Sequence, residues 1–545
     1  MQINLEKLDS FLPLVKKPAR YTGGELNSIV KQWDEQSLKI VFAFPDIYEI
    51  AMANVALQII YGLLNDQENV ICERVFSPWI DMEEQLRKNE VPLYSLETKH
   101  PLTDFDAIAI SLGYELSYTN ILNMLDLAGI PLERKNRTIN DPLIFAGGHA
   151  AFNPRPLEDF VDFFIIGEVE EVILELTKLL SKKKKPFNKE EIFLELAKIE
   201  GIYVPSLKNK VKRRIIKNLN NAFYPLRPIV PFIAPVHDRA NIEIMRGCAR
   251  RCYFCQAGYV SFPKRERSID VLLKQVEAII ASTGYEELSL LSLSSCDYSH
   301  IEELMERLDD FCGKHRISIS LPSSRMDSLK QGVIDIIQKH KANTITLAPE
   351  AGTQRLRDYI NKNITEEDIF KAIEVAKKSK IKSAKLYFMI GLPSETQEDI
   401  QGIIDLAFKL RTFLPITVSI SNFIPKPHTP FQRTRQIGPE EIAQKQAFLK
   451  NKIRGRNLKL RWHNANLSLL EGILSRGGQD LGIIIKKAWE AGCRFDAWEE
   501  TFQWQIWEKV LLDFLSEMNL ENKLDYFLRE RLEGEQLPWD IIDAG

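Results

Sequence analysis

The chain has 545 residues, 45% of them hydrophobic and 27% charged, with a formal net charge of −3. This composition is that of a globular protein of several domains, and its charge balance excludes a global basic field for nucleic acid while leaving a local RNA site open. Seven cysteines in this length exclude a disulfide framework, and no apolar run reaches the roughly 18 residues of a membrane span. The first residues carry an early acid and no apolar core, so we expect no signal peptide and a cytoplasmic protein without membrane contact.

Residues 1–178 have the pattern of a doubly wound α/β domain. Apolar strands are predicted at residues 38–44, 106–111, 143–146 and 163–166, with helical segments between them. Glycine-bearing turns follow the later strands, at Gly113, Gly147, Gly148 and Gly167. Because glycine has no side chain, the backbone at such turns can approach a flat or phosphorylated ligand closely. The pattern therefore predicts a flavodoxin-like domain with a ligand at its strand ends.

Residues 179–237 form a predicted connector. It carries basic runs at residues 182–185 and 208–217 and a helical stretch near residues 189–199. Charge runs of this kind usually form a solvated surface, and contact with RNA is the alternative. Four prolines between residues 225 and 235 predict an extended approach to the next domain.

Cys248, Cys252 and Cys255 form the motif C-x3-C-x2-C at the start of that domain. Three thiolates can hold three irons of a [4Fe-4S] cluster and leave the fourth iron open to a substrate or cofactor. The alternative is a structural zinc ion, which is usually four-coordinate. The nearest candidates for a fourth zinc ligand are His237 and Cys296.

Strands and amphipathic helices alternate from residue 238 to residue 455. Strands are predicted near residues 241–246, 288–293, 317–321, 344–347, 384–390 and 417–422, each followed by a helix. This alternation implies a parallel sheet, and six units make a (β/α)6 partial TIM barrel. Cys312 falls on the apolar face of the second helix, so we interpret it as a core residue.

Polar runs follow the strands of this predicted barrel. They lie at residues 294–297, 323–325, 349–353 and 391–396, in addition to the cysteines after the first strand. In parallel barrels, functional sites are built from the loops at the carboxyl ends of the strands. The five runs are therefore predicted to converge on one mouth.

The strand–helix alternation is predicted to stop after residue 455, so that residues 456–545 form a helical, aromatic-rich region. Five of the eight tryptophans lie between residues 462 and 507. We interpret this density as a helical cap over the barrel mouth, where a reactive species must be shielded from water. Ordinary core packing is the alternative for most of these rings.

Five long motifs occur between residues 245 and 431. They read Met-Arg-Gly-Cys at residues 245–248, Phe-Cys-Gln-Ala-Gly at 254–258, Leu-Ala-Pro-Glu-Ala-Gly-Thr-Gln-Arg-Leu-Arg at 347–357, Lys-Leu-Tyr-Phe-Met-Ile-Gly-Leu-Pro at 385–393 and Pro-Lys-Pro-His-Thr-Pro-Phe at 425–431. Together they resemble the radical S-adenosylmethionine (radical SAM) superfamily, and within it a B12-binding family of uncharacterised function. The resemblance extends over about residues 40–510 and implies a cobalamin-binding-like α/β domain followed by a radical SAM barrel and a helical tail.

The resemblance implies roles for the matching positions. The three cysteines ligate a [4Fe-4S] cluster, and SAM chelates the open iron. Phe254 touches the adenine, Glu350 contacts the ribose, and Arg325 pairs with the SAM carboxylate, for which a guanidinium is well shaped. The Gly-Gly-Glu segment that holds the SAM amino group is replaced by residues 294–297, and an ion pair of Arg325 with Glu350 is an alternative for those two. The implied SAM contacts are Phe254, Ser294, Ser295, Asp297, Arg325, Glu350, Met389, Ile390 and Gly391.

The resemblance also implies cobalamin at the N-terminal domain. Cobalamin domains often carry Asp-x-His-x-x-Gly at the first turn, whereas this chain has Asp46-x-Tyr48-x-x-Ala51. Since a phenol is a poor cobalt ligand, any cobalamin would lack a histidine ligand from this turn. The alternative is a domain that binds substrate or only packs, and His149 is interpreted as locally hydrogen-bonded. The implied cobalamin contacts are Tyr48, Ser111, Gly113, Gly147, Gly148, Gly167 and Glu168.

The function that the resemblance implies is that of a radical SAM enzyme. A reduced cluster cleaves SAM to a 5′-deoxyadenosyl radical, with methyl transfer to an unactivated carbon if cobalamin is bound. The alternatives are rearrangement or cyclisation without cobalamin, and a non-catalytic Fe–S binding partner. A methylthiotransferase is disfavoured, because Cys72 alone stands where a second cluster would need ligands. The expected partners are an electron donor such as flavodoxin or ferredoxin and a small-molecule, RNA or peptide substrate.

Overall fold

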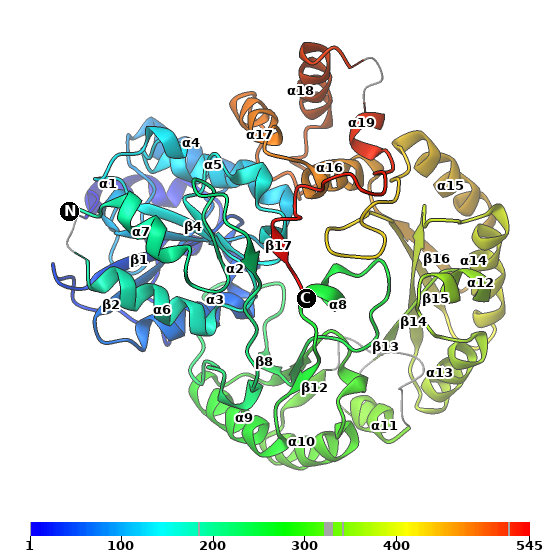
Figure 1. Ribbon diagram of the computed structural model, residues 1–545. Coiled ribbons are helices and arrows are strands. Elements are labelled where there is room, and N and C mark those ends of the chain that lie inside the picture. The colour runs from blue at the N-terminus through cyan, green and yellow to red at the C-terminus, as the bar shows by residue number, and fades with distance from the viewer. Residues whose placement is uncertain (1, 184–185, 321–330, 340–342, 521–523) are drawn as a thin grey trace.

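The computed structural model describes residues 2–183, 186–320, 331–339, 343–520 and 524–545. An N-terminal α/β domain lies beside a strand–helix barrel, and the C-terminal helices lie above the junction of the two (Figure 1). No helix in these ranges is both long enough and apolar enough to cross a membrane.

The N-terminal domain is built on a six-stranded sheet of order β2-β1-β3-β4-β5-β6. The first five strands are parallel, in the order of flavodoxin-like folds, and β6 runs antiparallel to β5. The predicted doubly wound domain is therefore confirmed. The strands are β1 Leu38–Phe44, β2 Val70–Phe76, β3 Ala107–Ser111, β4 Leu143–Gly147, β5 Phe163–Ile165 and β6 Ile202–Tyr203.

Helices cover both faces of this sheet. Helices α4 (Ile80–Lys88) and α5 (Tyr118–Leu127) pack with Val41 and Ala43 of β1, whereas α3 (Val55–Asn65) and α6 (Val169–Ser181) pack with Ile40 and Phe42. Because alternate residues of a strand point to opposite faces, a strand covered on both sides must be apolar throughout. This is why β1 is a continuous apolar run. Two short helices, α1 (Leu5–Phe11) and α2 (Tyr48–Met52), complete the domain.

Strand β2 is absent from the strands predicted above, because Glu73 and Arg74 interrupt its apolar sequence. The structure buries both of these side chains. Arg74 forms ion pairs with Glu25 at 2.7 Å and with Glu97 at 2.6 Å. A buried charge needs such partners, and here they come from loops distant in sequence.

The barrel contains the six predicted strands and one more. Parallel strands β8, β11 and β12 form one group, and β13, β14, β15 and β16 form another. The expectation that the alternation ends at residue 455 is wrong, because β16 (Leu458–Trp462) pairs in parallel with β15. The other strands are β8 Ala240–Glu243, β11 Glu287–Leu291, β12 Ser318–Ser320, β13 Thr344–Glu350, β14 Ser383–Ile390 and β15 Ile416–Asn422.

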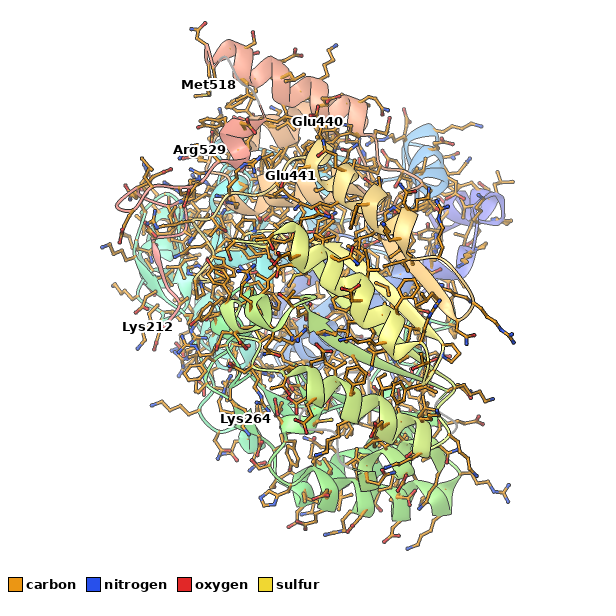
Figure 2. The ribbon with its side chains drawn as sticks, turned by 90° about the vertical axis from the view of Figure 1, so that its right-hand side faces the viewer. Lys212, Lys264, Glu440, Glu441, Met518 and Arg529 are labelled. Carbon is orange, nitrogen blue, oxygen red and sulfur yellow. The ribbon has the colours of Figure 1, made fainter. Side chains whose placement is uncertain are left out.

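Helices line the outer face of the barrel strands. Thr365 and Thr396 start α13 and α14 with capping boxes, and Pro439 with two glutamates starts α15. Figure 2 shows this side of the barrel, with Glu440 and Glu441 in the first turn of α15. The helices are α9 Ile269–Thr283, α10 Ile301–His315, α11 Gln331–Lys339, α12 Gln354–Tyr359, α13 Glu366–Lys378, α14 Gln397–Leu410 and α15 Pro439–Lys452.

The predicted connector is integrated into the fold. It contributes α7 (Lys189–Leu196) and β6, and its strand β7 (Val211–Lys212) pairs in parallel with β17 (Ile542–Asp543). Within its basic run, Arg214 forms an ion pair with Glu171 at 2.8 Å, and Arg213 is buried. These two arginines therefore support the fold and are engaged within the protein.

The C-terminal helices pack mainly on the N-terminal domain, which corrects the interpretation of a cap over the barrel mouth. The apolar face of α17 lies against α5, and both belong to the same buried cluster. Aromatic side chains of this region are largely core, as the alternative interpretation held. The helices are α16 Ala465–Arg476, α17 Leu481–Glu490, α18 Trp504–Glu517 and α19 Asp525–Leu528.

Candidate functional site

The three cysteines lie on one loop between β9 (Met245–Arg246) and α8 (Gln256–Val260). The loop begins at Gly247, whose φ of +83° lies in the left-handed region. A Cβ atom at Gly247 would lie 2.4 Å from the carbonyl oxygen of Pro263, so only glycine fits this turn. The geometry before the first cysteine is thus dictated by backbone packing.

The thiols of Cys248 and Cys252 lie close enough to Cys255 to influence its ionisation. Desolvation raises the pKa of Cys255 to about 11, and the nearby Cys252 and Cys248 add to the rise. The backbone N–H of Arg250 donates to Cys248 Sγ at 3.5 Å. Across the described ranges, no three Cys, His, Asp or Glu side chains converge as ligands of a single metal ion would. Three thiols of one loop suit a cluster instead, since each sulfur then binds a different iron atom.

Phe254 extends from the cysteine loop to the carboxyl ends of the barrel strands. It packs against a small apolar cluster that includes Met389 of β14 and Phe423 after β15. The structure thus brings together two of the side chains implied to hold the adenine. Ile390 instead faces the helices in the barrel core, so only its backbone can contribute, and the N–H of Gly391 donates to Glu395.

The polar run after β11 is held by internal contacts. The carboxylate of Asp297 accepts hydrogen bonds from Arg250 on the cysteine loop and from the Ser294 hydroxyl. The hydroxyl of Ser295 lies 2.8 Å from that of Ser292. Ser294 and Ser295 are both buried, so this segment positions the cysteine loop through Asp297.

Glu350 ends strand β13 with a φ of +69°, a strained conformation for a residue with a side chain. Its carboxylate forms an ion pair with Lys362 at 3.0 Å. The predicted partner Arg325 lies outside the described residues, as do residues 323 and 324 of the third polar run. The carboxylate of Glu350 is therefore anchored by a lysine that the sequence analysis did not single out.

A cavity of about 590 Å³ separates the sheet of the N-terminal domain from the start of the cysteine loop. Its volume lies within the range of roughly 300–1,000 Å³ typical of small-molecule and cofactor sites. A second hollow, beside Gln58 and Tyr224, has a volume of only about 40 Å³ and cannot hold a cofactor. The wall of the large cavity includes Ser111, Gly147, Gly148, His149, Gly167 and Glu168 from the first domain and Met245, Arg246, Gly247, Leu291, Ser292 and Leu293 from the barrel.

Comparison with known proteins gives a consistent assignment. Residues 56–205 match the family described as "Radical SAM proteins, N-terminal", and residues 242–407 match "Radical SAM superfamily". An uncharacterized protein of Methanocaldococcus jannaschii is 34% identical over 403 residues, which are 72% of this chain and 83% of that protein. The chain belongs to the radical SAM superfamily. It is accordingly a radical SAM enzyme, of a superfamily that uses a [4Fe-4S] cluster and SAM.

Two solved structures share the fold of this radical SAM enzyme. The methyltransferase TsrM from Kitasatospora setae, with cobalamin and a [4Fe-4S] cluster bound, has a TM-score of 0.54 and 14% identity over 73% of this chain and 77% of TsrM. The cobalamin-dependent radical enzyme OxsB, with aqua-cobalamin and SAM bound, has a TM-score of 0.53 and 13% identity over 90% of this chain and 78% of OxsB. These likenesses support the fold class predicted from the sequence.

Five of the seven positions implied for cobalamin line the large cavity of the radical SAM enzyme, but Tyr48 and Gly113 do not. Tyr48 is buried, its hydroxyl donates to Glu25 at 2.9 Å, and it accepts the N–H of Phe232 at 3.1 Å. Burial raises the pKa of Tyr48 above its ordinary value. Buried polar groups need hydrogen-bond partners, and these two bonds satisfy the Tyr48 hydroxyl within the protein core.

Glu168 lies on the cavity wall, but its carboxylate is engaged across the domain junction. It pairs with Arg265 at 2.7 Å, and the neighbouring Glu170 pairs with Arg246 at 2.8 Å. Arg246 stands two residues before Cys248. These ion pairs fasten the N-terminal domain to the flanks of the cysteine loop.

Two residues of this radical SAM enzyme, Lys426 and His428, form contacts at the domain junction that were not identified from the sequence. Lys426 lies between the carboxylates of Glu115 and Glu471, at 3.0 and 2.8 Å, and so joins the barrel, the N-terminal domain and α16. The nearby His428 contacts the carbonyl oxygen of Phe152, a residue of the cavity wall, at 2.9 Å. The motif Pro-Lys-Pro-His at residues 425–428 was the available signal.

The other four cysteines are dispersed. Cys312 is buried within α10, as predicted, and Cys72 is fully buried in β2, where burial raises its pKa well above the ordinary value. Cys296 and Cys493 are buried in separate segments. The structure therefore offers no second cysteine set among the described residues.

Proposed function

We propose that this radical SAM enzyme binds cobalamin in the interdomain cavity and transfers a methyl group to an unactivated carbon of its substrate. The observation that carries the proposal is the position of the cavity. It extends from the carboxyl edge of the N-terminal sheet to Arg246 and Gly247, directly before the first cluster cysteine. A ligand held by the first domain would therefore face the site of SAM cleavage.

The walls of the cavity suit a large flat ligand. Apolar side chains on both sides, including Phe145, Phe152 and Leu293, would exclude water from its faces. At the strand ends, Gly147 and Gly167 present backbone without a side chain. Such a surface fits a macrocycle such as the corrin ring, and the cobalamin held by TsrM and OxsB supports this choice.

The residues around the cysteines would prepare the reaction. Asp297 holds the cysteine loop through Arg250, and Phe254 with Met389 would bury the adenine of SAM. The cluster would supply the electron for SAM cleavage, and cobalamin, when bound, would supply methyl-transfer chemistry. The protein's own contribution is to orient both groups and to exclude water.

A reductant and a reducing compartment follow from this proposal. The electron would come from a carrier such as flavodoxin or ferredoxin, and an oxygen-sensitive cluster would suit the cytoplasm. The test is to replace dithionite by reduced flavodoxin, which should sustain SAM cleavage. The substrate remains one of three classes, a small molecule, an RNA or a peptide.

A second candidate is a rearrangement or cyclisation without cobalamin. It is favoured by the departure at the first turn, where Tyr48 faces the core, and by the engagement of Glu168 with Arg265. In that case the interdomain cavity would hold the substrate itself.

The test is anaerobic reconstitution with iron and sulfide, followed by reduction with SAM and by addition of hydroxocobalamin. The proposal predicts tight uptake of the corrinoid and cleavage of SAM. Loss of iron in Cys252→Ala, with iron retained in Cys296→Ala, would assign the cluster and exclude Cys296 as a ligand. SAM cleavage without corrinoid uptake would favour the second candidate, and a cluster that leaves SAM intact would favour a non-catalytic Fe–S protein.

A further inference from the structure

Two histidines stand on the wall of the interdomain cavity, His149 from the first domain and His237 from the barrel side. The ring of His237 has a partner, since its Nδ1 lies 3.1 Å from the guanidinium of Arg239. His149 forms no hydrogen bond or ion pair with any residue in the part of the chain that the structure describes. The local hydrogen bond expected for His149 is therefore not found.

The backbone fixes where the His149 ring lies. Gly148 before it has a φ of +130°, and a Cβ there would lie 2.4 Å from the carbonyl oxygen of Leu112. The next residue, Ala150, is buried and donates its N–H to the same carbonyl at 3.0 Å. His149 itself remains exposed, because its side chain borders the cavity while its neighbours pack into the core. The turn after β4 thus presents an imidazole to the cavity.

The chemical state of this imidazole suits a metal ligand. Although the ring borders open space, surrounding protein desolvates it, and this desolvation together with the charge of Lys426 lowers the pKa of His149. A neutral imidazole has a free lone pair on one ring nitrogen. When a ligand fills this largely apolar cavity, the imidazole loses its hydrogen bonds to water. A partner on the ligand that binds the ring nitrogen would replace them.

Other donors on the wall are less available. Met245 is 1% exposed and belongs to the barrel core, and the carboxylate of Glu168 is held by Arg265. Tyr48, at the turn that often supplies a histidine, faces away from the cavity. Only His149 combines a position on the wall with a ring that has no partner among the described residues.

We propose that His149 is the protein's axial nitrogen ligand to the cobalt of a corrinoid bound in this cavity. This inference rests on the proposed function, and it assigns the ligand to the turn after β4 instead of the turn after β1. The imidazole nitrogen donates its lone pair to cobalt and displaces a water molecule or the dimethylbenzimidazole base. No electron is gained or lost in this exchange, so it requires no oxidant or reductant.

The test uses the full-length protein and cob(II)inamide, a corrinoid that lacks the dimethylbenzimidazole base. Any axial nitrogen in its electron paramagnetic resonance spectrum must then come from the protein. We expect a three-line nitrogen splitting in the wild-type spectrum, and a two-line splitting when the protein carries ¹⁵N-labelled histidine. His149→Ala should lose the splitting and bind the corrinoid at least about tenfold more weakly, since even the loss of a residue that only supports a metal ligand costs about 10- to 100-fold in metal affinity. His237→Ala should keep both.

The outcomes separate this inference from the proposed function. If wild-type protein binds cob(II)inamide without nitrogen splitting, or if the splitting persists in His149→Ala, the assignment of His149 is wrong while cobalamin binding stands. If neither cob(II)inamide nor cobalamin binds, the proposed function fails together with the assignment. If His149→Ala does not fold, His149→Gln and the isotope comparison in His237→Ala decide the question. A two-line splitting in ¹⁵N-histidine-labelled His237→Ala would assign the nitrogen to His149, the other histidine on the cavity wall.

Discussion

Arg250 and Asp297 form a two-point ion pair between the cysteine loop and the end of strand β11. Arg250 Nε donates to Asp297 Oδ2 at 2.9 Å, and a second guanidinium nitrogen donates to Oδ1. The geometry is that of a bidentate arginine–carboxylate contact, which fixes orientation as well as distance. Since Arg250 lies between Cys248 and Cys252, this contact sets the position of the loop that carries the thiols.

Replacing Asp297 by Asn should loosen the cysteine loop. The side chain keeps its shape but loses its charge, at a cost of about 1.5–3 kcal/mol for hydrogen bonds to a charged group. We expect less iron per protein after reconstitution and faster hydrogen exchange in residues 248–255. The matched control is Asp309→Asn, which breaks a more exposed pair with Lys339. Equal iron content in both variants would contradict a positioning role for Asp297.

Tyr48→Phe tests the placement of the first turn. The variant removes a hydroxyl that donates to Glu25 and accepts from the N–H of Phe232. We expect a loss of about 1–3 kcal/mol in stability, because a buried amide and carboxylate lose a partner. Corrinoid binding, measured by absorption titration, should not change. A large loss of corrinoid affinity without loss of stability would show that Tyr48 faces the ligand after all.

Asp496 should make stability depend on pH in an unusual direction. Desolvation raises its pKa to about 6, against the hydrogen bonds that it accepts from Thr119 and Trp507. Because the folded pKa lies above the unfolded value of about 3.9, the folded state binds more protons between these two pH values. Its contribution to stability is therefore complete below about pH 4 and is lost as the pH rises through about 6.

The corresponding variant is Asp496→Asn. The amide can still accept from Trp507, and the Thr119 hydroxyl can rotate to accept from the amide nitrogen. A pKa raised by about two units means that ionisation of Asp496 destabilises the folded protein by about 3 kcal/mol. The variant has no carboxyl group to ionise, so it avoids this loss of stability. We expect the variant to gain thermal stability relative to wild type as the pH rises from 4 to 7. If the difference between the two melting temperatures stays the same from pH 4 to pH 7, the pKa of Asp496 is not raised in the folded protein.

Lys426→Met should weaken the junction of the three parts of the chain. Although burial opposes its charge, the carboxylates of Glu115 and Glu471 raise the pKa of Lys426 above its ordinary value. Without the lysine, two partly buried carboxylates repel each other, at a cost of about 3 kcal/mol. A lower melting temperature and faster proteolysis between domains are expected, with partial recovery in Lys426→Met/Glu115→Gln. Lys409→Met, which breaks an exposed pair with Glu366, should behave as wild type.

Strands that bury mainly apolar side chains were predictable from the sequence. Strands β2 and β16, which each contain two charged side chains, were not. Strand β1 is apolar on both faces and was predicted with its observed bounds. Strand β16 alternates Leu458 and Leu460, which face the barrel helices, with the exposed Lys459 and Arg461, so its apolar signal is weak. Strand β2 contains the buried Arg74, whose partners Glu25 and Glu97 come from loops outside the strand. Such partners can be known only once the tertiary structure is known.

The same distinction holds for the candidate site. The local spacing of Cys248, Cys252 and Cys255 and the aromatic Phe254 pointed to the cysteine loop and its apolar neighbour. The large cavity was not predictable, because it forms only where two domains meet. Nor was the orientation of Tyr48, which depends on Glu25 from a separate segment. Periodicity describes each element, whereas a cavity between domains depends on how the elements dock.

The ion pairs of Glu168 with Arg265 and of Glu170 with Arg246 have a consequence for how a bulky ligand enters. They cross the junction of the two domains beside the cavity, so any widening of the cavity at this junction has to break them. If a macrocycle enters by such widening, its uptake by the folded protein should level off at a rate set by opening, however much ligand is supplied. Occupancy in a purified sample would consequently record whether the ligand was present while the chain folded, more than how tightly it is held.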